Sequence, residues 1–251
     1  MDFIIYSTFD KSLERLNNEE QKQTKITVMD LQLAPDRPGQ QLHKIDRARD
    51  SRFATIRVNR DLRIVVYQDG SRMVICYVDH HDAAYRWAQN RRFEEHPITG
   101  SAQIVEVVET VEQVTRVQEV VVEKKPAALG HVSTEDLLGY GVPQEWVSVV
   151  READEEYLLN VAGHLPQEAQ EAVLQLMVGE LPTLPTPRVE GQDPFQHPDA
   201  QRSFRIVSNQ EELERALEFP WERWMVYLHP DQRYLVEKSF NGPARVSGSA
   251  G

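Results

Sequence analysis

The sequence is poor in cysteine, with Cys76 as its one thiol in 251 residues. A single cysteine excludes a disulfide within the chain and a cysteine-rich metal site, and its place in the apolar run 73–78 predicts a buried thiol. The chain also lacks an apolar stretch near the ~18 residues that a membrane span needs. Its first residues, MDFIIYSTFDKSLERL, lack the basic and long apolar regions of a secretory signal. These absences predict a cytoplasmic protein with no membrane partner and no metal site.

Positive charge is scarce overall but unevenly spread along the chain. The sequence has 28 Lys and Arg residues against 40 Asp and Glu residues, a net charge of -12. Residues 1–95 hold 16 basic and 15 acidic residues, a net charge of +1, so the remainder carries -13. The stretch 37–63 has eight basic residues against three acidic ones. A locally basic segment suits a phosphate-bearing partner such as DNA or RNA, although an ordinary solvated strand face has the same composition.

Residues 1–95 have the pattern of a small α+β domain. Apolar residues recur at helical spacing on either side of Asn17-Asn18, a turn signal, and Asp69-Gly70 is a strong hairpin signal between two apolar runs. We therefore expect a helical hairpin over 9–33, a β-meander with strands at 53–58, 63–67 and 73–78, and a short helix over 80–92.

The middle of the chain divides into a linker, a helical spacer domain and a second linker. Residues 96–130 contain repeated Val and Glu at 101–123, where β-branched content favours a strand but the apolar positions also fit a helical stripe. Residues 131–180 predict short helices, one starting at the cap-like Ser133 and the last at Pro166. Residues 181–200 are Pro-rich and predict an extended linker lying on the surface.

Residues 201–251 predict a strand at 204–208, a helix at 209–217 and a glycine-rich turn at the end. The final residues NGPARVSGSAG place a strand-like run before Gly248, Ser249, Ala250 and Gly251. These four match the first half of the phosphate-binding pattern G-x-x-x-x-G-K-[ST], in which backbone N–H groups hold the phosphates of a nucleotide. A Gly/Ser-rich tail would give the same four residues.

The segment Leu228-His229-Pro230-Asp231-Gln232-Arg233 resembles the L-N-x-x-Q-R motif of UvrD/Rep-type superfamily I DNA helicases. That resemblance implies the start of a P-loop α/β motor domain, cut within its phosphate loop, in which Gln232 reads the adenine of ATP. ATP and Mg²⁺ would then be cofactors of a full-length parent. Because the lysine and hydroxyl residue of the motif are absent, we expect this chain neither to bind ATP tightly nor to hydrolyse it. The candidate ATP-binding residues are Gln232, Arg233, Gly248, Ser249, Ala250 and Gly251.

Two segments of the N-terminal domain, 55–67 (TIRVNRDLRIVVY) and 78–86 (VDHHDAAYR), resemble the RelE/ParE/HigB toxin superfamily. The resemblance covers residues 1–92 and implies a helical hairpin packed on a curved antiparallel sheet. RelE and HigB types cleave messenger RNA on the ribosome, whereas ParE types act on gyrase and are not nucleases. An antitoxin-like or other protein partner is also implied.

The resemblance implies a catalytic site. Arg57 and Arg63 match the strand arginines of the family and would stabilise a pentavalent phosphate. His80, His81 and Tyr85 lie where the family places its last-strand and terminal-helix residues, and imidazoles exchange protons near neutral pH. The sequence departs from RelE-type nucleases in two ways: the lysines before the first arginine are replaced by Phe53 and Thr55 or their neighbours, and position 81 is His where those nucleases have Arg.

Three functions are compatible with these patterns. The first is an ATP-dependent DNA helicase whose toxin-like domain is an accessory module that binds nucleic acid or a partner. The second is a toxin-like ribonuclease with a regulatory extension. The third is a non-enzymatic interaction protein that uses the acidic region 96–200 as its docking surface.

Overall fold

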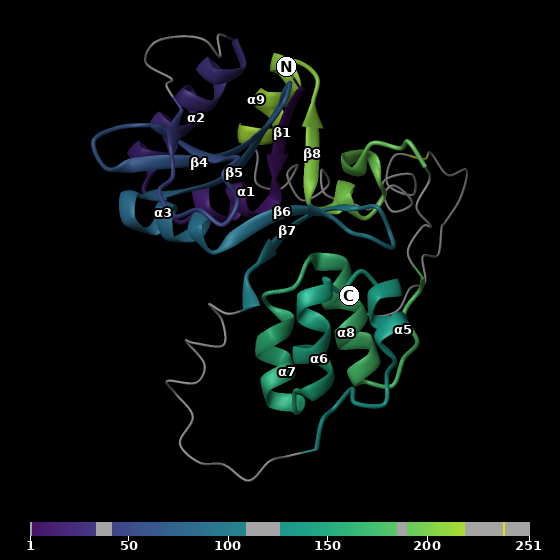
Figure 1. The fold of residues 1–251 in the computed structure, drawn as a ribbon. Coiled ribbons are helices and arrows are strands. Elements are labelled where there is room, and N and C mark those ends of the chain that lie inside the picture. The colour runs from purple at the N-terminus through teal and green to yellow at the C-terminus, as the bar shows by residue number, and fades with distance from the viewer. Residues whose placement is uncertain (1, 34–41, 109–125, 185–189, 219–237, 239–251) are drawn as a thin grey trace.

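The computed structural model describes residues 2–33, 42–108, 126–184, 190–218 and 238 (Figure 1). The residues expected to bind ATP, at 232–233 and 248–251, lie outside this part of the chain, as does most of the Val/Glu segment. The described residues form an α+β unit around a six-stranded sheet and a smaller all-α unit. No P-loop motor domain is present among the described residues.

The sheet has the strand order β2-β3-β4-β5-β1-β8. The predicted β-meander is confirmed, with β3, β4 and β5 antiparallel to one another and Gly70 at φ 57° in the turn between β4 and β5. That positive φ explains the glycine, because other residues rarely adopt it. The strands span Asp2–Tyr6 (β1), His43–Lys44 (β2), Phe53–Arg57 (β3), Leu62–Asp69 (β4), Arg72–His80 (β5) and Phe204–Val207 (β8).

Strand β1 makes the sheet mixed, which corrects the expectation of an antiparallel sheet. β1 runs parallel to β5, with Phe3 opposite Met73, and antiparallel to β8. Phe3, Ile4 and Ile5 are all buried, since β1 lies inside the sheet with apolar neighbours on both faces. A short continuous apolar run of this kind lacks the alternation of a half-buried strand, and the sequence analysis did not identify it.

One face of the sheet is covered by the predicted helical hairpin, α1 (Ser7–Leu13) and α2 (Asn18–Leu33). The turn between them is held by Asn17, whose Oδ1 accepts from the Glu20 N–H at 3.0 Å while Glu20 Oε2 accepts from the Asn17 N–H at 3.2 Å. This reciprocal capping explains why α2 begins at Asn18. Helix α9 (Gln210–Glu218) packs against the same face beside α2.

The other face carries α3 (His81–Gln89) and the strand pair β6 (Arg91–Glu95) and β7 (Ala102–Glu106). Helix α3 is shorter than the predicted 80–92, because the chain turns at Asn90 and continues as β6. Residues 102–106 of the unsettled Val/Glu segment form β7. The thiol of Cys76 is buried on this side of the sheet, as predicted.

Residues 190–218 return to the sheet. The predicted strand and helix are found as β8 and α9. β8 pairs with β1 at the edge of the sheet, and α9 packs on one face of it. The preceding 3-10 turns, η3 (Pro194–Gln196) and η4 (Ala200–Arg202), bury Phe195 against Phe93 and Phe204. This part of the Pro-rich segment therefore packs into the core, contrary to the surface-lying linker that its composition predicted.

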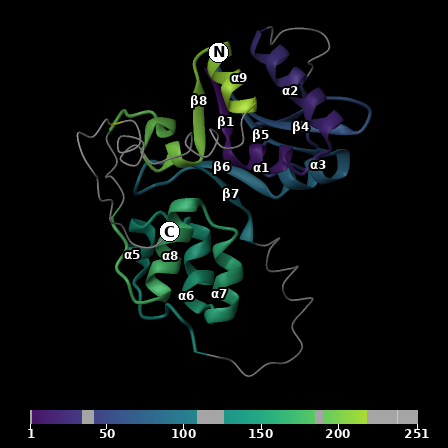
Figure 2. The ribbon, with the colours of Figure 1, turned by 180° about the vertical axis from the view of Figure 1, so that it is seen from behind.

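The all-α unit lies on the far side of β6 and β7 from the sheet in both views (Figures 1 and 2). Its core surrounds the fully buried Trp146. The predicted cap is confirmed, since Ser133 Oγ accepts from the Asp136 N–H at 3.0 Å. The elements are α5 (Thr134–Gly139), η2 (Gln144–Trp146), α6 (Val147–Glu152), α7 (Glu155–Ala162) and α8 (Gln167–Met177).

Buried polar contacts join the two units. Gln103 of β7 donates from Nε2 to Glu168 Oε1 at 2.6 Å and to the Gly141 carbonyl at 3.1 Å. Burial raises the pKa of the Glu168 carboxyl to about 7. Nearby, Glu106 contacts Arg91 at 2.7 Å and His164 at 3.2 Å. Hairpin β6–β7 is thus bonded to the helices by the buried pair Gln103 and Glu168 and by the partly exposed pair Glu106 and His164.

Helices in the described part of the chain are too short or too polar to cross a membrane.

Candidate functional site

Arg57 and Arg63 lie directly opposite each other on β3 and β4. Opposite residues in an antiparallel pair have their side chains on the same face. This is the face toward α3, because Val65, which is two residues beyond Arg63, is buried in the core beneath α3. Both guanidinium groups donate to one carbonyl oxygen, that of Asn59, from Arg57 Nε at 2.9 Å and from Arg63 Nη1 at 3.1 Å. The fold therefore brings two positive charges together where β3 ends and β4 begins.

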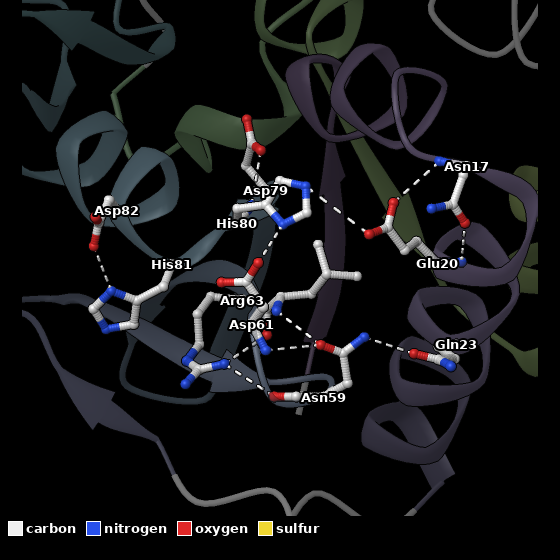
Figure 3. Close-up of polar contacts among 11 residues, drawn as sticks. Asn17, Glu20, Gln23, Asn59, Asp61, Arg63, Asp79, His80, His81 and Asp82 are labelled. Atoms are coloured by element: carbon white, nitrogen blue, oxygen red, sulfur yellow. Dashed lines mark hydrogen bonds and ion pairs between the residues drawn. The ribbon is translucent and has the colours of Figure 1, made fainter.

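Asn59 fixes this arrangement, and the sequence analysis missed it. Its Oδ1 accepts from the backbone N–H groups of Asp61 and Leu62, both at 2.9 Å. Its Nδ2 donates to Gln23 Oε1 of α2 at 2.6 Å (Figure 3). The turn that carries the shared carbonyl is thus bonded within itself and to a helix. The signal was available in the sequence, because Asn commonly bonds the backbone two residues ahead in tight turns.

The two guanidinium groups have no ion pair with a carboxylate of the described residues. Asp79 is opposite Arg63 on β5, but its carboxylate accepts from the Tyr77 hydroxyl at 2.8 Å and the His80 N–H at 2.7 Å. Burial, followed by this contact with Asp79, raises the pKa of Tyr77 to about 12. Arg57 is exposed and Arg63 is partly exposed, so the pair is accessible to an anion from solution.

Tyr85 and His81 of α3 stand on the same side of the sheet. The Thr55 hydroxyl, two residues before Arg57 on β3, donates to the Tyr85 hydroxyl at 3.3 Å. The imidazole of His81 stacks on the Tyr85 ring, with centroids 4.4 Å apart and an interplanar angle of 25°. His81 Nδ1 is 2.8 Å from Asp82 Oδ1. Since a carboxylate only accepts, Nδ1 carries a proton and Nε2 is left as the acceptor nitrogen when the ring is neutral.

His80 does not join this group, although the sequence placed it there. It ends β5 with its side chain on the face covered by α1 and α2, where its Nδ1 is 2.8 Å from Asp61 Oδ2 and its Nε2 is 3.9 Å from Glu20 Oε1 (Figure 3). Side chains alternate along a strand, so His80 and Asp79 point to opposite faces of the sheet. Helix α3 begins at His81, and this change of direction places the His81 side chain on the face opposite to His80. Four of the five predicted residues therefore share one face, and His80 lies on the opposite one.

This face has the chemistry of a phosphate site with proton-transfer groups beside it. Two guanidinium groups suit an anionic phosphate, and the acceptor nitrogen of His81 is placed to accept a hydrogen bond from a bound hydroxyl. Among the described residues, no cluster of three or more His, Cys, Asp or Glu side chains is arranged to bind a metal ion.

Comparison with known proteins gives likenesses in structure. No family model and no curated protein matches the chain. One similar chain, from the crystal structure of the RelB-RelE antitoxin-toxin complex from Methanococcus jannaschii, is 19% identical with a TM-score of 0.28, covering 33% of this chain and 95% of that one. The YoeB/ParE toxin from Agrobacterium tumefaciens is 13% identical with a TM-score of 0.28, covering 32% of this chain and 99% of the toxin. Each match covers about a third of this chain and nearly all of the other.

Proposed function

We propose that the α+β unit binds RNA through its phosphate backbone and cleaves it. The observation that carries this proposal is the convergence of Arg57 and Arg63 on one carbonyl oxygen, with His81 and Tyr85 on the same face. The two arginines hold the scissile phosphate and stabilise the charge that its oxygens gain in the transition state. RNA is the substrate because its 2′-hydroxyl supplies an attacking oxygen that DNA lacks.

The test is cleavage of a 5′-labelled RNA, offered alone and as messenger bound to ribosomes. The double variant Arg57→Ala with Arg63→Ala is compared with Arg215→Ala, which removes one exposed guanidinium from α9 on the opposite face. Wild type and Arg215→Ala should cleave at similar rates, and the double variant should be slower by about 10²-fold or more. Absence of cleavage by the wild-type protein in both formats, or an unaffected double variant, would contradict the proposal.

The motifs at Gln232 and Gly248–Gly251 support a second proposal, from a different class. In it the chain is part of an ATP-dependent DNA helicase. The arginine face, which is the face of the sheet toward α3 that carries Arg57 and Arg63, is then an accessory surface for nucleic acid or a protein partner. Gln232→Ala in a parent that completes the phosphate loop should raise the ATP concentration needed for unwinding and leave GTP use less affected. An unchanged nucleotide preference would remove Gln232 from the adenine site. The antitoxin-like partner stays a prediction from the sequence.

A further inference from the structure

We propose that His43 is the general acid of the RNA-cleaving site, an inference that rests on the proposed function. In the proposed site, His81 is the histidine that accepts a proton. No residue described so far has the role of protonating the leaving oxygen. Cleavage by a 2′-hydroxyl needs both roles, since the attacking oxygen loses a proton and the departing 5′-oxygen gains one. His43 comes from a part of the chain that the sequence analysis left out of the site.

The register of β2 places His43 on the arginine face. β2 pairs antiparallel with β3, with His43 opposite Thr55 and Lys44 opposite Ala54. Side chains directly opposite each other share a face, so His43 is on the side of Thr55. Ile45, two residues further on, is buried in the core beneath α3, which agrees with this orientation. Ala54 belongs to the core beneath α1 and α2, so Lys44 is directed to the other face.

His43 therefore lies beside the groups already described. Its partner Thr55 donates to the Tyr85 hydroxyl, and the next residue of β3 on that face is Arg57. The imidazole of His43 is exposed, and no described residue forms a hydrogen bond or ion pair with it. Thr55 and Tyr85 thus stand between two histidines, His43 on β2 and His81 on α3.

The reaction can be written with balanced atoms and protons. Nε2 of His81 removes the proton of the 2′-hydroxyl, and the 2′-oxygen forms a bond to the phosphorus atom held by Arg57 and Arg63. The bond from phosphorus to the 5′-oxygen breaks, and the imidazolium of His43 gives its proton to that oxygen. The products are a 2′,3′-cyclic phosphate and a 5′-hydroxyl. Proton exchange with water restores both histidines, so no further reactant is needed.

A substrate with sulfur in place of the bridging 5′-oxygen distinguishes a residue that acts as the general acid from one that only supports the structure. A thiolate leaves without protonation because its conjugate acid is much stronger than an alcohol, whereas an alkoxide needs the acid. The experiment measures single-turnover cleavage of the oxygen and sulfur substrates at saturating protein. The variants are His43→Gln, His81→Gln and Lys44→Gln, the last a matched control on the same short strand with its side chain on the opposite face.

His43→Gln should cleave the oxygen substrate about 10²–10⁴-fold more slowly than wild type and the sulfur substrate within about tenfold of it. His81→Gln should be slow on both substrates, and Lys44→Gln should match wild type on both. Equal losses on the two substrates for His43→Gln, or no loss on either, would overturn the acid role while leaving the proposed function in place. Failure of wild type to cleave the oxygen substrate would overturn both.

Discussion

Arg57 and Arg63 donate to the same backbone oxygen, the carbonyl of Asn59, at 2.9 and 3.1 Å. Two like charges side by side repel each other, and the shared acceptor offsets part of that repulsion. The oxygen is in turn fixed by the Asn59 side chain, which bonds the turn and reaches Gln23 of α2. The position of the arginine pair therefore depends on one asparagine that need not touch a ligand.

Replacing Asn59 should accordingly affect both stability and RNA handling. Asn59→Ala removes the acceptor of the N–H groups of Asp61 and Leu62, which should lower the free energy of unfolding by about 0.5–1.5 kcal/mol, because the bond from Asp61 is exposed and that from Leu62 is only partly buried. Urea denaturation measures this change, with Asn160→Ala on the exposed surface of α7 as the control. RNA cleavage by Asn59→Ala should also fall at temperatures where the variant is folded. A stable variant with wild-type cleavage would show that the turn does not position the arginines.

Salt dependence reports how many phosphates the arginine face neutralises. On a single strand, each Lys or Arg that contacts a phosphate adds about 0.7 to the magnitude of the slope of log affinity against log salt. Arg57→Ala with Arg63→Ala should therefore weaken binding of single-stranded RNA and reduce that slope by about 1–2. Fluorescence anisotropy over a range of salt concentrations provides the measurement. A weaker affinity with the wild-type slope would mean that the arginines act without contacting phosphate.

Glu168, which lies between the all-α unit and the β6–β7 hairpin, should make the stability of the protein depend on pH. Its pKa is raised by burial from 4.5 to about 7, so the folded protein holds a proton that the unfolded chain has lost at pH values between these two. Stability from this group is present below about pH 4.5 and is lost as the pH rises toward 7. The loss amounts to on the order of 3 kcal/mol.

The substitution Glu168→Gln tests this linkage, because glutamine has the shape of the protonated carboxyl. Thermal unfolding at pH 8 should occur at a higher temperature for Glu168→Gln than for wild type, and the two should agree at pH 4, below the pKa of the unfolded carboxyl. Glu180→Gln, on an exposed residue just after α8, is the control. If Glu168→Gln is the less stable protein at pH 8, the buried carboxyl is charged and paired rather than protonated.

The sequence predicted local features of the fold better than long-range ones. The meander around Asp69-Gly70, the hairpin at Asn17-Asn18 and the cap at Ser133 each depend on nearby residues and are confirmed. Strand β1 and its pairing with β8 were missed, because two short apolar runs about 200 residues apart give no periodic signal of their association.

In the candidate site too, residues within a local motif were predicted from the sequence, and residues that depend on strand pairing were missed. Arg57 and Arg63 were identified from a motif, and they lie opposite each other across β3 and β4. His80 and His81 are neighbours in sequence, yet a strand end and a helix start direct them to opposite sides. His43 required the register of β2, a strand of two residues that composition does not reveal.

RNA cleavage by this protein is tested most directly by the chemistry of the RNA ends, measured by mass spectrometry after incubation with the wild-type protein. Attack by the 2′-hydroxyl should give products ending in a 2′,3′-cyclic phosphate and a 5′-hydroxyl, and no cleavage where the scissile nucleotide lacks its 2′-hydroxyl. RNA recovered intact from the protein, or fragments ending in a 3′-hydroxyl and a 5′-phosphate, would contradict it.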